Sequence, residues 1–143
     1  EYDWVISAGQ WDMIKQDTQR IGFDPHNAYQ TVAQMEASGV KMEPVAQDKK
    51  RISPAAKFVE EQIKKGQIDF GGNPVISWMF ANVRIDHDAQ GNYGLNKKKS
   101  VGKIDGVLAL CNAAYLYLND AATAAKQTKS TYESAEWDAL LGL

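Results

Sequence analysis

The sequence predicts an α/β fold, because short strand-like segments alternate with longer helix-like segments along its 143 residues. Apolar and β-branched residues beside turn residues predict strands at 20–23, 40–45, 67–70, 82–86 and 93–95. Apolar residues recurring at every third or fourth position predict helices at 3–18, 26–39, 53–66, 73–81 and 101–125. The strands are few and short for a complete sheet, and the chain opens without a methionine, so we expect it to be a piece of a larger protein.

Residues with known capping preferences mark the boundaries of these helices. Ser53-Pro54 combines a favoured N-cap with a proline suited to the first helical position, which makes 47–51 a polar loop. Asn73-Pro74 starts the next helix, and Gly66 ends the one before it. Ser100 is the expected N-cap of the last and longest helix.

Composition limits the classes of function open to the chain. Sixteen basic and eighteen acidic residues give a net charge of -2, so any contact with DNA must come from a local basic patch. The single Cys111 excludes an internal disulfide and a cysteine zinc cluster, and its apolar surroundings predict a buried thiol. We expect no membrane partner and a cytoplasmic location, because neither an apolar run of about 18 residues nor a leader segment is present.

Two acids stand where a metal ligand is chemically reasonable. Asp24 follows a strand-like run, and open α/β sheets place their ligands at the carboxyl ends of strands; the residues alone favour a helix cap instead. Asp105 lies in the apolar run Ile104-Asp105-Gly106-Val107-Leu108 at the start of a helix. The helix dipole favours an ionised carboxylate there, and such a carboxylate binds hard divalent cations. Compensation of the dipole at an exposed position is an equally good explanation.

Lysines gather next to Asp105. Lys97, Lys98, Lys99 and Lys103 form the strongest basic cluster, and they would attract DNA phosphates in a salt-dependent manner if Asp105 binds metal. A solvated face is the ordinary interpretation of such a run.

The acidic segment Asp86-His87-Asp88 contains one of the two histidines. Metal binding is one interpretation, but a turn-forming sequence follows directly, so we expect a solvated hairpin end.

Several blocks, taken in order, resemble the C-terminal nuclease domain of the HK97-like large terminase subunits of tailed phages. They are Tyr2-Asp3-Trp4, Ile21-Gly22-Phe23-Asp24-Pro25, Gln47 with Ser53-Pro54, the stretch from Gly71-Gly72-Asn73-Pro74-Val75 to Asn82-Val83, and Lys103-Ile104-Asp105-Gly106-Val107. The resemblance covers residues 2 to about 120. Each block is weakly diagnostic by itself, whereas the ordered set is fairly specific.

The resemblance implies an RNase H-like nuclease fold over residues 1–125, incomplete at its N-terminus, followed by a flexible tail at 126–143. It implies a metal-dependent endonuclease that cuts concatemeric double-stranded viral DNA during genome packaging. It also implies a motor domain in the same full-length protein, and a small subunit and a portal as its partners. It also implies two Mg²⁺ or Mn²⁺ ions held by three acids, with Asp24 and Asp105 as the second and third.

The chain departs from the family pattern at its start. The strand that should carry the first acid is missing upstream of Tyr2, and neither Asp3 nor Asp12 is a convincing substitute because both fall in a predicted helix. We therefore expect the chain alone to be inactive or very weak, and its unpaired strand edges to favour pairing with another copy. A non-catalytic DNA-binding or portal- or motor-docking module with a degenerate site is the alternative function.

Overall fold

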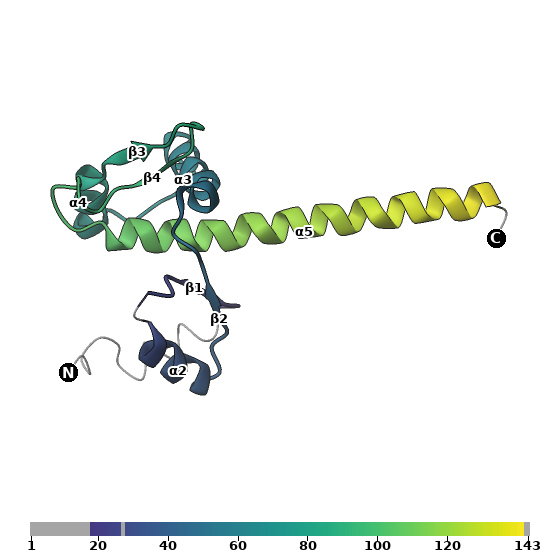
Figure 1. Cartoon of the computed structure of the whole chain (residues 1–143), viewed down its shortest axis with the longest axis horizontal. Helices are drawn as coiled ribbons and strands as arrows, with labels where there is room; N and C mark the ends of the chain where they lie inside the picture. The colour runs from purple at the N-terminus through teal and green to yellow at the C-terminus, as the bar shows by residue number, and fades with distance from the viewer. Residues whose placement is uncertain (1–17, 27, 142–143) are drawn as a thin grey trace.

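The computed structural model describes residues 18–26 and 28–141, with side chains described as far as residue 125. Its elements are, in order, β1 (Ile21–Phe23), α2 (Tyr29–Ala37), β2 (Met42–Pro44), α3 (Lys49–Lys64), α4 (Pro74–Asn82), β3 (Ile85–His87), β4 (Tyr93–Leu95) and α5 (Asp105–Leu141). The predicted helix at 3–18 lies almost wholly outside the described residues. Figure 1 shows α5 as a long straight helix between two groups of elements: α3, α4 and the β3–β4 hairpin on one side, and β1, α2 and β2 on the other.

Two small sheets replace the single sheet that the alternation of elements suggests. β1 pairs in parallel with β2, with Ile21 opposite Met42, and β3 pairs with β4 in the antiparallel direction. Four of the five predicted strands are therefore confirmed. The strand predicted at 67–70 is wrong, because the segment is irregular and the Phe70 ring packs on the Phe80 ring of α4, with 5.3 Å between centroids.

β1 approaches α5 closely at Gly22. A β-carbon at this position would lie 3.1 Å from a terminal carbon of Leu116 and 3.1 Å from one of Val45. Contacts this short would force the neighbouring atoms to shift by a few tenths of an ångström. The glycine therefore permits the close packing that holds the end of β1 against α5.

The start of α3 differs from the prediction. The helix begins at Lys49, and its N-cap is Asp48, whose carboxylate accepts a hydrogen bond from the backbone N–H of Arg51. The predicted polar loop at 47–51 and the predicted cap at Ser53 are both wrong. Ser53 is buried, and its hydroxyl oxygen accepts a hydrogen bond of 3.2 Å from the backbone N–H of Tyr93, which joins α3 to β4.

α5 begins four residues later than predicted and continues beyond residue 125. Ser100 does not cap it, because the Ser100 hydroxyl donates to the carbonyl oxygen of Asn96 at 2.7 Å and closes the lysine-containing turn. The backbone stays helical to Leu141. The division into a domain at 1–125 and a flexible tail at 126–143 stays a prediction.

The main core forms where α3, β4 and α5 meet. Its buried members include Val45, Ile52, Val59, Tyr93 and Cys111. The buried thiol predicted for Cys111 is confirmed, and burial raises its pKa to about 11. Within the described residues, no helix combines the length and the apolar character needed to cross a bilayer.

The start of α5 should depend on the burial of Ile104, which is 1% exposed. We expect Ile104→Ala to lower the free energy of unfolding by about 2–5 kcal/mol, because it leaves a cavity beneath the first turn. Val101→Ala is the control: Val101 is 79% exposed, so its truncation should change stability by less than about 0.5 kcal/mol. Urea unfolding measures both values, and equal losses would contradict this account of the core.

Candidate functional site

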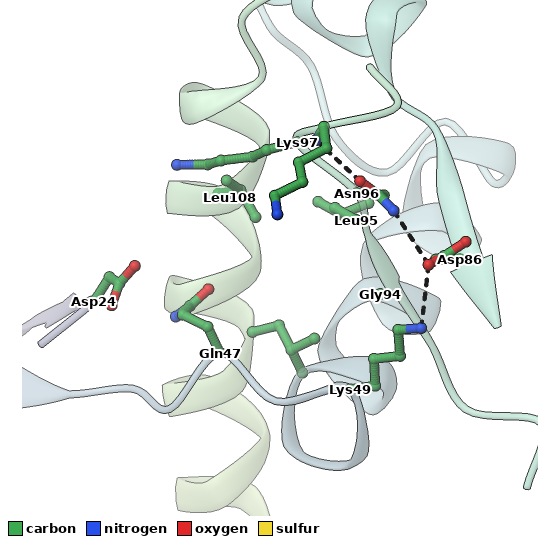
Figure 2. Close-up of a pocket in the computed structure, with 11 residues that line it drawn as sticks. Asp24, Gln47, Lys49, Asp86, Gly94, Leu95, Asn96, Lys97 and Leu108 are labelled. Carbon is green, nitrogen blue, oxygen red and sulfur yellow. Dashed lines mark hydrogen bonds and ion pairs between the residues drawn. The ribbon is translucent and has the colours of Figure 1, made fainter. Parts of the chain in front are cut away.

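A pocket of about 320 Å³ lies where the end of β1, the start of α3, the β3–β4 hairpin and α5 come together. Figure 2 shows Asp24 and Gln47 on one side of it and Asp86, Asn96 and Lys49 on the other. Residues from distant parts of the sequence therefore contribute carboxylate, amide and ammonium groups to one cavity.

Asp24 stands at the carboxyl end of β1 and lines this pocket. Its side chain is exposed, and its carboxylate accepts a 3.0 Å hydrogen bond from the backbone N–H of His26. The helix-cap interpretation is wrong: the N-cap of α2 is Ala28, and no side chain makes a capping hydrogen bond there. Asp24 is thus available for binding at the end of a strand, as the alternative interpretation required.

Asp105 is the first residue of α5, and its side chain is 61% exposed. Its apolar neighbours do not bury it, because Ile104 and Val107 face the core while Asp105 points away from it. Its carboxylate lies 3.0 Å from the Lys97 ammonium. That ion pair lowers the pKa of Asp105 against the opposing effect of partial burial, so the carboxylate is ionised at neutral pH.

Asp86 belongs to the pocket, which corrects the prediction of a solvated hairpin end. Its carboxylate accepts hydrogen bonds from the ammonium groups of Lys99 at 2.6 Å and Lys49 at 3.3 Å, and from the amide nitrogen of Asn96 at 3.1 Å. These donors hold its pKa at about 2, with Lys99 as the largest cause. Asp88 does form the hairpin turn, where it accepts the backbone N–H groups of Gln90 and Asn92.

The predicted lysine cluster divides into groups with different surroundings. The side-chain oxygen of Asn96 accepts the backbone N–H groups of Lys98 and Lys99, at 2.9 and 3.0 Å, and so shapes the turn. Lys97 and Lys98 line the pocket, whereas Lys99 pairs with Asp86. Lys103 is exposed and acts on Asp105 only through its charge.

Sequence reasoning missed Lys49 and Gln47 as pocket residues. The signal was their place in the segment Gln47-Asp48-Lys49-Lys50-Arg51, which contains three basic residues but was predicted to be a polar loop. Gln47 donates from its amide nitrogen to the Asn112 side chain of α5 at 3.0 Å, so it is fixed in the pocket wall.

Asp24 and Asp105 have the donor chemistry of a hard divalent cation site. Both are exposed carboxylates, and oxygen ligands of this kind suit Mg²⁺ and Mn²⁺. Lys97 connects them indirectly, because it lines the pocket beside Asp24 and pairs with Asp105. In the part of the chain that the structure describes, no three His, Cys, Asp or Glu side chains gather closely enough to hold a metal by themselves. Asp24 lines the pocket and Asp105 does not, so the two carboxylates are separate oxygen donors that a complete site would have to bring together with a further ligand.

Comparison with known proteins gives a consistent result. The family described as "Terminase large subunit, endonuclease domain" matches residues 2–120. The chain is 30% identical over 117 residues to the "Terminase, large subunit" of Enterobacteria phage HK97, which covers 77% of this chain and 22% of that protein. It is also similar to the crystal structure of the HK97 bacteriophage large terminase, with a TM-score of 0.65 and 27% identity over 73% of this chain and 22% of that one. The chain thus spans about a fifth of its relative's length.

The low pKa of Asp86 gives a testable dependence on pH. Because it lies below the ordinary value of 3.8, ionised Asp86 stabilises the fold above that pH, and this contribution is lost as the pH falls to about 2. In a carboxyl-carbon NMR titration, we expect a midpoint near 2 that moves upward in Lys99→Met. Lys65→Met, which removes the partner of Glu61 on α3, should leave the midpoint unchanged. A wild-type midpoint near the ordinary value would show that the network does not form.

Proposed function

This chain belongs to the terminase large subunit endonuclease-domain family, and we propose that it is part of a longer nuclease that cuts DNA with Mg²⁺ or Mn²⁺ bound at Asp24 and Asp105. Family membership confirms the resemblance found in the sequence, and with it the α/β, RNase H-like fold class. One observation carries the proposal: Lys97, which pairs with Asp105, lines the same pocket as Asp24. Asp24 lines that cavity directly, whereas Asp105, about eighty positions later in the sequence, is linked to it through Lys97.

The proposed substrate is concatemeric double-stranded viral DNA, cut during genome packaging in the bacterial cytoplasm. The proposed partners are the motor domain of the longer protein, the small subunit and the portal. These roles belong to the proposal because the chain spans 22% of the length of its HK97 relative. A second copy of the chain is a further proposed partner, since within the described residues β1 pairs with β2 alone and its other edge can accept a strand.

The residues around the pocket have complementary proposed roles. When bound, divalent cations supply positive charge that activates water and stabilises the leaving oxygen of a phosphodiester. Asp24 and Asp105 provide oxygen ligands for them. Lys98 and Lys103 attract the phosphate backbone, while Lys97 and Lys99 contribute less as long as their ammonium groups pair with Asp105 and Asp86.

We also propose that the 143-residue chain cuts DNA weakly or not at all. Support comes from the ligand set, because two carboxylates hold two divalent cations poorly and a further carboxylate is needed to complete the site. In a plasmid-nicking assay with Mn²⁺, we expect little product over the reagent background. Robust cutting that Asp105→Asn abolishes would contradict this expectation while supporting the nuclease assignment.

Binding of Mn²⁺ tests the site without requiring turnover. We expect Asp24→Asn and Asp105→Asn each to lower Mn²⁺ affinity by at least about tenfold, because each removes a charged oxygen ligand. Electron paramagnetic resonance of free Mn²⁺ measures the affinity. Glu61→Gln is the matched control, since Glu61 is an exposed carboxylate on α3 that pairs with Lys65. Affinity that neither aspartate changes would favour the alternative of a non-catalytic DNA-binding or docking module.

A further inference from the structure

Lys97 makes contacts that its neighbour Lys98 does not make. Both side chains line the pocket that holds Asp24. The Lys97 ammonium lies 3.0 Å from the Asp105 carboxylate, whereas no carboxylate of the described residues forms an ion pair with Lys98. Two lysines of equal charge, adjacent in sequence, therefore differ in one respect that bears on the site.

The backbone that carries Lys97 is held firmly. The side-chain oxygen of Asn96 accepts hydrogen bonds from the backbone N–H groups of Lys98 and Lys99. Its backbone carbonyl oxygen accepts hydrogen bonds from both the backbone N–H and the hydroxyl of Ser100. The Asn96 amide also donates to Asp86. A change of partner by Lys97 therefore involves the side chain alone, which is 60% exposed and free to move through solvent.

The ammonium and a divalent cation are alternative partners for one carboxylate. A cation that binds Asp105 must replace the Lys97 ammonium or accept a positive charge beside it, and either costs binding free energy. A displaced lysine carries an unpaired charge on a flexible stem at the edge of the pocket. Lysine binds phosphate as a point charge, so the backbone of a bound nucleic acid is its natural second partner.

We propose that Lys97 exchanges partners, pairing with Asp105 when the cation is absent and with a DNA phosphate when the cation is bound. The inference rests on the proposed function of Asp105 as a metal ligand. It has two consequences of opposite sign: Lys97 weakens binding of the cation alone, and it strengthens binding of DNA in the presence of the cation. By linkage, each ligand then favours the other.

The test compares Lys97→Gln with Lys98→Gln, which removes the same charge from the same pocket. In Mn²⁺ titrations followed by electron paramagnetic resonance, we expect Lys97→Gln to bind Mn²⁺ about twofold to fivefold more tightly than wild type, the range expected for loss of an exposed ion pair. The Mn²⁺ affinity of Lys98→Gln should lie closer to that of the wild type. Lys97→Arg keeps a positive charge beside Asp105, so its Mn²⁺ affinity should resemble that of the wild type.

A second measurement follows the coupling to DNA. Fluorescence anisotropy of a labelled short duplex, with and without Mn²⁺, gives the gain in DNA affinity that the cation produces. We expect this gain to be smaller in Lys97→Gln than in Lys98→Gln.

The possible failures are distinguishable. Equal effects of Lys97→Gln and Lys98→Gln on Mn²⁺ affinity would show that only the net charge of the pocket matters, and would overturn the exchange of partners. The proposed metal site would still stand in that case if Asp105→Asn lowers Mn²⁺ affinity. Mn²⁺ affinity that Asp105→Asn does not change would instead refute the proposed site, and the exchange with it.

Discussion

Apolar packing between α3 and α5 is the contact on which the rest of the structure depends. Ile52 and Val59 of α3 and Cys111 of α5 are buried in one core. Because the two helices meet there, the first turn of α3 lies near the start of α5, and the hairpin that follows is fixed across both. The charged residues of the pocket lie beside this core, so the elements that carry them are positioned by apolar contacts that include none of these charged residues.

Local sequence signals predicted the elements whose boundaries depend on adjacent residues. Asn73 caps α4 by accepting the N–H groups of Val75 and Ile76, and Gly66 ends α3 with a φ of 65°. The start of α3 was not predicted in this way, because its N-cap is Asp48, five residues before the predicted Ser53. The Ser53 hydroxyl, predicted to cap the helix, instead accepts a hydrogen bond from the backbone N–H of Tyr93, forty residues away along the chain.

Part of the residue set of the candidate site was predictable from the sequence, but its arrangement was not. Asp24 and Asp105 were identified from their sequence blocks, and the lysines from their charge. The pairing of one lysine with Asp105 and another with Asp86 depends on a turn that Asn96 shapes and on a hairpin placed against α3. No periodicity or composition encodes contacts of that range, which is why Asp86 was assigned to solvent and Lys49 to a loop.

Gly22 also affects the position of Asp24, the acid two residues after it. A methyl group at this position would press on Leu116, Val45 and the backbone carbonyl of Asn112, and the easiest relief is for the strand to move away from the helix. Asp24 would move with it. The absence of a β-carbon at Gly22 therefore helps to keep the acid close to α5. Among related sequences, any larger residue here should be accompanied by a smaller residue at 45 or 116.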